Sequence, residues 1–358
     1  MRLLPLGDVA QDLSFRIGSW RRQRAKIQSD PFVIDPRVDP HSRELGFYHC
    51  YAAEDGDTLA WLRSPAYVIE AKKAHPIDAC HLAVAQFHAH LETGSLESRE
   101  RFLAQVDAIL ASGVTDERGF VIPHDQAIEG YPPHETGWLN AMVQGWIAAL
   151  CARAYQLTAD DRYVALARGA LVVFRRPVER GGVRSRERHG ATFFEKYALL
   201  GQSRHVLNGF FSALLSLWDV ARALGDDDAG MLFEEGLMTL SPTVLDSYDL
   251  GYSTLYEQSV ERQATPASVF YTWVHTRHLA ALARISGRHD LEVRATRWRE
   301  YSSSWVHQLR TSVDCLRYRA RNVPGYLDRL RQRPPRLEAS AAEPVTGSSR
   351  PRSSGSSS

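Results

Sequence analysis

Eight stretches of the chain carry apolar residues at helical spacing, and two kinds of stretch alternate. Residues 137–157 and 204–224 are apolar on nearly every face, whereas the stretches that follow them keep a polar face, as at Glu234 and Glu235. A helix that is apolar all round has to be buried, and an amphipathic helix can cover it from outside. The alternation therefore predicts an all-α fold, an α/α toroid (an incomplete α/α barrel) with inner and outer helices.

Glycines mark the ends of several of these stretches. Gly94, Gly225 and Gly287 each follow an apolar run and precede a polar residue that can start the next helix. Connections this short predict antiparallel helix pairs. The helices are expected over residues 79–93, 97–112, 137–157, 160–174, 204–224, 227–242, 266–286 and 288–310.

Residues 181–200 interrupt the helical pattern. Gly181 and Gly182 turn the chain there, and the following ATFFEKY alternates as a strand does. This segment predicts a small β-hairpin at the cleft of the toroid. A second break, at residues 247–258, predicts a loop or a short hairpin.

The two ends of the chain differ from its middle. Residues 334–358 are rich in Ser, Pro, Arg and Gly, too poor in apolar groups to offset the entropy of ordering them, and predict a disordered tail. Residues 1–44 predict an N-terminal helical extension. Its basic run up to Lys26 fits either a solvated helix face or a helix on a membrane surface or partner. Residues 45–333 form the remaining domain.

Charge and cysteine content narrow the function classes. The chain has 43 Lys and Arg against 42 Asp and Glu, so it offers no general electrostatic reason to bind nucleic acid, and an anionic ligand needs a local patch. Its four cysteines lack metal-ligand spacing, which predicts reduced thiols and no metal site. No apolar run approaches the ~20 residues that span a bilayer, and no secretory signal is visible. We expect a cytoplasmic protein that does not span a membrane.

Three strings, at residues 135–158, 205–220 and 248–257, resemble the most recognisable segments of the C-terminal catalytic domain of the D-glucuronyl C5-epimerases, in the same order. Weaker likenesses occur at residues 75–87 and 116–125. The resemblance implies an α/α toroid that binds an acidic glycan, as in heparan sulfate biosynthesis. It also implies removal of the C5 proton of a D-glucuronosyl residue and its return from the opposite face to give L-iduronosyl.

Proton transfer at C5 needs two acid/base groups on opposite faces of the sugar and donors that neutralise the carboxylate, and it requires no cofactor. The resemblance implies active-site tyrosines at Tyr197 and Tyr256, which we expect across one cleft. The family's glutamate falls on Lys196. Strand alternation places Glu195 and Tyr197 on one face and Lys196 on the other, so Glu195 is a catalytic candidate if the register shifts.

The third family tyrosine corresponds to Val274, which cannot move a proton. Tyr271 lies one helical turn upstream and is a substitute. His275 is another, because its ordinary pKa near ~6.5 allows it to act as acid or base near neutrality. A histidine at a helix start can equally be a cap or a core hydrogen-bonding group.

The remaining candidates are substrate-binding residues. Asn208 and Gln144 fall in the first turns of inner helices, where amides favour an anion such as a sugar carboxylate. Trp138 can stack on a sugar or simply fill the core. Arg186 and Arg204 can hold a polyanionic chain by bidentate pairing.

Three functions remain open from the sequence. The first is a uronosyl C5-epimerase, an isomerase acting on a glucuronate-containing polysaccharide. The second is a polysaccharide lyase, which starts with the same proton abstraction and then expels the C4 substituent. The third is a degenerate toroid that binds or scaffolds acidic glycan, which Lys196 and Val274 favour. A homodimer is one option for the assembly.

Overall fold

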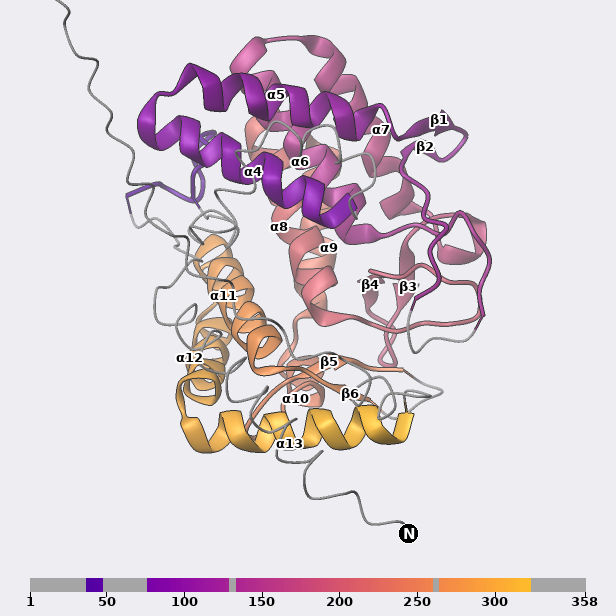
Figure 1. The fold of residues 1–358 in the computed structure, drawn as a ribbon, viewed down its shortest axis with the longest axis vertical. Helices are drawn as coiled ribbons and strands as arrows, with labels where there is room; N and C mark the ends of the chain where they lie inside the picture. The colour runs from indigo at the N-terminus through magenta and orange to yellow at the C-terminus, as the bar shows by residue number, and fades with distance from the viewer. Residues whose placement is uncertain (1–36, 48–75, 129–132, 260–263, 323–358) are drawn as a thin grey trace, which may run out of the picture. The chain divides into compact units, whose positions relative to one another are not determined.

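The computed structural model describes residues 37–47, 76–128, 133–259 and 264–322 (Figure 1). All of them belong to one unit, Met1–Pro324. The predicted N-terminal extension over residues 1–44 lies outside the described residues except for its last part, and the predicted tail over residues 334–358 lies wholly outside them. The domain limits at residues 45 and 333 therefore stay predictions.

Each predicted helical range is found, with shifted ends. The range expected over residues 288–310 is split at Ser304, because the hydroxyls of Ser302 and Ser303 bond back to the carbonyl of Arg299 and the helix stops there. None of the described helices is long and apolar enough to cross a membrane. The helices are α4 (Pro76–Thr93), α5 (Leu96–Leu110), α6 (Ala141–Thr158), α7 (Asp161–Arg175), α8 (Leu207–Leu224), α9 (Asp227–Thr239), α10 (Pro242–Ser247), α11 (Val269–Ser286), α12 (His289–Ser303) and α13 (Trp305–Asn322).

The helices pack in two layers. Consecutive pairs α4–α5, α6–α7, α8–α9 and α11–α12 lie against each other, and α4, α6, α8 and α11 are neighbours in that order (Figure 1). Every residue of α6 from Ala141 to Ala154 is buried, whereas α7 buries one stripe that includes Tyr163, Ala170 and Phe174. These burial patterns confirm the all-α class and the α/α arrangement of inner and outer helices predicted from the sequence.

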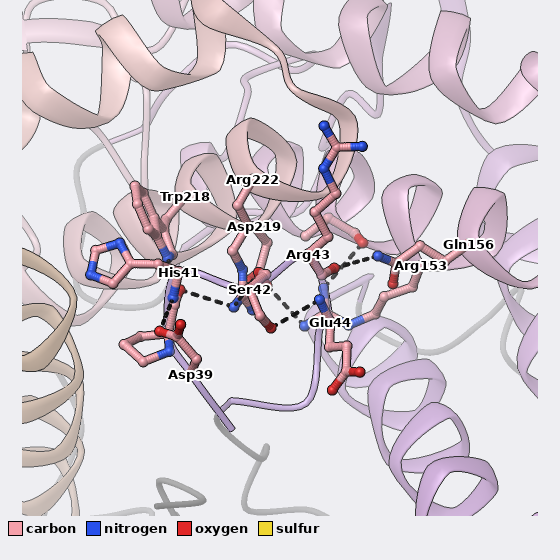
Figure 2. Close-up of polar contacts among 12 residues, drawn as sticks. Asp39, His41, Ser42, Arg43, Glu44, Arg153, Gln156, Trp218, Asp219 and Arg222 are labelled. Carbon is pink, nitrogen blue, oxygen red and sulfur yellow. Dashed lines mark hydrogen bonds and ion pairs between the residues drawn. The ribbon is translucent and has the colours of Figure 1, made fainter. Parts of the chain in front are cut away.

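A buried polar network joins the inner helices at the ends far from their N-termini (Figure 2). Arg153 of α6 and Asp219 of α8 form a fully buried ion pair with an N–O distance of 2.8 Å. Arg222 also pairs with Asp219 and donates to the carbonyl of Pro40 at 3.1 Å. Trp218 Nε1 donates to the same carbonyl at 2.9 Å. The network thus fixes the segment 37–47 against α8.

Three antiparallel hairpins complete the described fold. The hairpin predicted within residues 181–200 is confirmed. The predicted break at residues 247–258 supplies one strand of another hairpin, and its partner strand was not expected. The strand pairs are β1 (Val114–Asp116) with β2 (Gly119–Val121), β3 (Arg184–Arg186) with β4 (Thr192–Phe194), and β5 (Leu255–Glu257) with β6 (Thr265–Pro266).

The chain that leaves β4 lies at the N-terminal ends of α6 and α8. The N–H of Ala141 donates to the carbonyl of Glu195 at 3.0 Å, and the N–H of Ala198 donates to that of Leu139 at 3.0 Å. Residues 195–198 are therefore held at the N-terminal ends of inner helices.

Candidate active site

Four side chains from three segments meet beside these helix ends. Lys196 Nζ donates to Tyr256 Oη at 2.9 Å, and Tyr197 Oη lies 3.5 Å from Tyr256 Oη. The rings of Tyr256 and Tyr271 contact edge to face, with their centroids 4.7 Å apart. We call Lys196, Tyr197, Tyr256 and Tyr271 the tyrosine–lysine cluster. Lys196 is 4 % exposed, whereas the three tyrosines are partly exposed.

Lys196 reaches Tyr256 because α8 has a glycine where the lysine stem passes. A Cβ atom added to Gly209 would lie 2.5 Å from Lys196 Cβ. Lys196 and Tyr197 both contact Tyr256, so the expectation that strand alternation puts them on opposite faces is wrong. The reason is local: β4 ends at Phe194, and the period of two does not continue beyond a strand.

Burial and charge act in opposite directions on the phenols. Burial raises the pKa of Tyr197 and of Tyr256 well above the ordinary value near 10. The positive charge of Lys196 lowers the pKa of Tyr197 in part, because an ammonium favours a nearby phenolate. Both phenols are thus protonated donors at neutral pH, and the lysine stabilises the negative charge that remains when a proton leaves.

His275 lies behind the cluster on α11. Its Nδ1 is 2.8 Å from Thr254 Oγ1, and its Nε2 has no hydrogen-bond partner within the described part of the chain. Burial lowers the pKa of His275 well below the ordinary value, and the charges of His278 and Lys196 lower it further. The imidazole is therefore neutral and can accept a proton only against the field of the lysine.

Val274, at the position where the family resemblance implies a third tyrosine, makes apolar contacts. Val274 is buried and packs with Trp273 and with the partly buried Phe270. Tyr271, one turn earlier on α11, is the residue whose ring reaches Tyr256. The structure thus brings the proposed substitute Tyr271 to the cluster, while Val274 belongs to the core.

The hydrogen bonds of Glu195 go to groups other than the phenols. It is fully buried, accepts from Ser185 Oγ at 2.7 Å, and accepts the backbone N–H of His205 at 3.0 Å. His205 has a φ of 46°, a left-handed conformation that costs a non-glycine residue free energy. Burial raises the pKa of Glu195 to about 7, although its hydrogen bonds lower it in part. These contacts make Glu195 the group that holds the strained turn before α8.

The two candidate arginines are also bonded within the protein. Arg204 Nη1 lies 3.6 Å from Glu257 Oε1, with both side chains buried, and the Arg204 carbonyl accepts the N–H of Gln258 at 3.0 Å. These contacts fix β5, and with it Tyr256, beside the turn before α8. Arg186 is exposed on the hairpin and donates to the Gly190 carbonyl at 2.7 Å. A contact between Arg186 and glycan stays a prediction.

Gln144 has a structural role in place of the predicted substrate-binding role. Its Oε1 accepts the N–H of Ile122 at 3.0 Å and its Nε2 donates to the Phe120 carbonyl at 3.0 Å. The side chain is fully buried, so it ties β2 to α6. A predicted first-turn amide is thus used to satisfy the backbone of a neighbouring strand.

Asn208 and Trp138 lie next to the cluster. Asn208 is in the first turn of α8, beside Gly209, and its buried Oδ1 has no hydrogen-bond partner among the residues that the structure describes. The ring centroid of Trp138 is 5.8 Å from that of Tyr197, and Trp138 stacks on His124 at 4.5 Å. The sequence placed both residues at the candidate site, and the structure brings both near it.

The hydroxyls of Tyr197 and Tyr256 lie too close together to flank a sugar ring. A ring held between two proton-transfer groups needs about 6–7 Å between them, since each has to approach to about 3–3.5 Å. Tyr197 Oη and Tyr256 Oη are 3.5 Å apart, so the expectation that they face each other across a cleft is wrong. Within the described ranges, no group of three or more His, Cys, Asp or Glu side chains is arranged to hold a metal ion.

Comparison with known proteins adds a family and two relatives. The family model described as D-glucuronyl C5-epimerase C-terminus matches residues 116–300. The D-glucuronyl C5-epimerase of Caenorhabditis elegans is 29% identical over 212 residues, which cover 54% of this chain and 33% of the relative. An uncharacterized protein of Methanocaldococcus jannaschii is 35% identical over 124 residues, which cover 34% of this chain and 40% of that protein. The chain thus spans less than half the length of these relatives.

Two solved structures are similar at a lower level. The unsaturated glucuronyl hydrolase from Bacillus sp. GL1 has 16% sequence identity and a TM-score of 0.45, over 71% of this chain and 66% of that one. The unsaturated glucuronyl hydrolase from Streptococcus agalactiae has 13% identity and a TM-score of 0.46, over 72% of this chain and 65% of that one. The family match, in contrast, includes all four residues of the tyrosine–lysine cluster.

Proposed function

Because the chain belongs to the family described as the C-terminus of D-glucuronyl C5-epimerase, we propose that it is a carbohydrate isomerase. It inverts C5 of D-glucuronosyl residues within an acidic polysaccharide and gives L-iduronosyl residues. The contact of Lys196 with Tyr256, beside Tyr197, carries this proposal. Two phenols beside one positive charge are groups that can help a weakly acidic carbon acid to lose a proton, which supports the proposal.

The roles follow from the chemistry of the C5 proton. Removing it places negative charge on the adjacent carboxylate, so nearby donors and cations accelerate the step. The phenol of Tyr256 first loses its own proton to solvent, and the phenolate, which Lys196 stabilises from 2.9 Å, then takes the C5 proton. In a site largely closed to water this attraction is stronger than in solution. The hydroxyl of Tyr197 donates to the substrate carboxylate as charge develops there.

The second proton of an epimerisation has to arrive from the opposite face of the sugar. Tyr197 does not fill that role, because its hydroxyl lies 3.5 Å from that of Tyr256. The candidates for that role are Tyr271, whose ring contacts that of Tyr256, and groups outside the tyrosine–lysine cluster. Trp138, 5.8 Å from the Tyr197 ring, is 7 % exposed and stacked on His124, so its contact with a sugar stays a prediction.

The one-sided placement of the phenols also favours a second candidate, a uronate polysaccharide lyase. A lyase removes the same C5 proton and then protonates the departing C4 oxygen. Two adjacent hydroxyls can perform both transfers from one face when those groups are syn. The 3.5 Å separation of Tyr197 and Tyr256 is the observation that supports this alternative.

Heavy water separates the candidate functions in one experiment. The protein is incubated with heparosan, chondroitin and other glucuronate polymers in deuterium oxide, and each polymer is examined by NMR and by ultraviolet absorbance. An epimerase puts deuterium at C5 and leaves chain length unchanged. A lyase shortens the chains and produces absorbing 4,5-unsaturated uronate ends. Binding of a polymer with neither change would contradict both reactions and leave a glycan-binding scaffold.

A further inference from the structure

Helix α13 exposes its apolar residues and buries polar ones. Its buried residues are Gln308, Thr311 and Cys315. Trp305 is 65 % exposed and Leu309 is 53 % exposed. An ordinary surface helix shows the reverse polarity, with its apolar stripe against the core. The exposed side of α13 therefore has the composition of a contact surface.

The contacts that dock α13 on the protein are polar. Gln308 Nε2 donates to the Ser302 carbonyl, and Thr311 Oγ1 donates to the Tyr252 carbonyl at 3.5 Å. Cys315 Sγ donates to the Ala267 carbonyl at 3.4 Å. Docking thus uses the small polar face and leaves the large apolar side chains pointing outward.

The outward side chains form one stripe along the helix. Their spacing of three and four residues puts them on a single face of an α-helix. The stripe, called the α13 stripe below, consists of Trp305, Leu309, Val313, Leu316 and Ala320, each exposed or partly exposed.

Arginines flank the α13 stripe on both sides. At 100° per residue, Arg310 and Arg317 lie along one flank and Arg319 along the other, with Arg321 near the end. Asp314, the one acidic residue of the helix, accepts from Tyr252 Oη at 2.6 Å and pairs with Arg317 at 3.3 Å, while the guanidinium of Arg310 lies 3.8 Å from the centre of the Tyr252 ring. The exposed side of α13 is therefore apolar in the middle and cationic at its edges.

We infer that α13 lies flat on an anionic lipid surface, with the α13 stripe at the acyl boundary and the arginines among the headgroups. A helix with an apolar face and flanking cations has the chemistry that such a surface binds, and Trp is favoured at this depth. Anionic lipids attract each nearby arginine. The arrangement lies on a membrane without crossing it, which fits the finding that none of the described helices can span one.

The charges and apolar residues of α13 favour a lipid surface over two other partners, a second copy of the chain and an acidic glycan. A second copy of α13 packed stripe to stripe would bring the flanking arginines of both copies together, which is unfavourable. An acidic glycan would pair with the arginines but would leave Trp305 and Leu309 in water. A lipid surface satisfies both the apolar and the cationic parts.

Vesicle flotation tests this inference on the whole chain. The probes are phosphatidylcholine vesicles with and without phosphatidylserine, at low and high salt. The variant is Trp305→Ser with Leu309→Ser. The matched control is Met231→Ser with Met238→Ser, because these exposed residues are on α9. Both variants replace solvent-exposed side chains, so thermal midpoints like that of the wild type confirm folding.

We expect the wild type to float with phosphatidylserine vesicles and to be released by salt. The Trp305→Ser, Leu309→Ser variant should bind at least ~10-fold more weakly, because it loses apolar area at the interface, and the α9 control should bind like the wild type. Equal binding by the two variants would overturn the inference. A wild type that binds no vesicle would also overturn the inference. In that case, a dimer that the α13 substitutions dissociate would identify a second copy as the partner of α13, and heparosan binding through α13 would identify an acidic glycan.

Discussion

The ammonium of Lys196 lies 2.9 Å from the hydroxyl of Tyr256, across 60 residues of chain. The contact joins the segment after β4 to strand β5, and it needs Gly209 on α8 to let the lysine stem pass. A cation thus stands at the position where the family resemblance implies a glutamate. The account of the site depends on this pair, because the lysine decides how readily the phenol can hold negative charge.

Replacing Lys196 by Met should lower the rate of C5 exchange by about 10²-fold, since the phenolate of Tyr256 loses its stabilising charge. The sign of the pH effect follows from the same contact. Without the ammonium the pKa of Tyr256 rises, so the rising limb of the rate profile moves to higher pH. Rates measured across pH check this, and an unshifted profile would show that Lys196 does not act on the proton-transfer group.

Gly209→Ala should disturb the lysine without touching a reacting group. The added Cβ would lie 2.5 Å from Lys196 Cβ, so the lysine has to move, and a shift near 1 Å can cost about 10²-fold in rate. Gly230→Ala on α9 is the control, because its nearest neighbour would be Ala221 Cβ at 3.9 Å. The C5 exchange rates of the two variants are compared at equal folded fraction. Equal rates would remove the steric argument.

Glu195→Gln should change how stability depends on pH. The folded state raises the pKa of Glu195 from 4.5 to about 7, so its contribution is fully present below pH 4.5 and is lost as pH rises to about 7. At about 1.4 kcal/mol per unit the loss is roughly 3 kcal/mol. Unfolding in urea at pH 5 and pH 8 should therefore show a smaller loss for the variant. Parallel losses in both proteins would contradict this assignment.

Asp219→Asn should destabilise the fold strongly. Asp219 and Arg153 are both fully buried, and the substitution removes the carboxylate that balances a buried guanidinium, at a cost of about 3–5 kcal/mol. Asp107→Asn is the matched control, because its pair with Arg162 is about half exposed and is worth less than about 1 kcal/mol. Urea unfolding of the two variants measures the difference. Similar free energies of unfolding would show that the buried network contributes little.

The helical framework could be predicted because its signal is periodic. Residues Ala141 to Ala154 are buried without a break, and that requires the all-round apolar pattern visible in the sequence. The break at Ser304 was missed. Serine hydroxyls that donate to a carbonyl of the preceding turn can bend a helix or end it, and the sequence does not distinguish the two cases. The partner strand Thr265–Pro266 was missed because two residues carry no period.

The sequence identified residues of the candidate site, but it did not predict correctly in which direction their side chains point. The strings of family likeness located Tyr197 and Tyr256. The facing of Glu195 and Lys196 was extrapolated from a strand that ends at Phe194. Gln144 could not be assigned, since its partners are backbone groups of residues 120 and 122. The role of Gly209 had one visible signal, a glycine inside an otherwise apolar helix, which indicates a close approach.

The rate of deuterium incorporation at C5 in wild type and Tyr256→Phe tests the central claim most directly. Tyr163→Phe on α7 is the control, because it removes a hydroxyl bonded to Asp107 and leaves the tyrosine–lysine cluster intact. We predict that wild type and Tyr163→Phe label a glucuronate polymer at C5 and that Tyr256→Phe labels it about 10²- to 10⁴-fold more slowly with an unchanged fold. A Tyr256→Phe variant that labels as fast as the wild type, or a wild type that labels no polymer, would contradict the claim that this phenol moves the C5 proton.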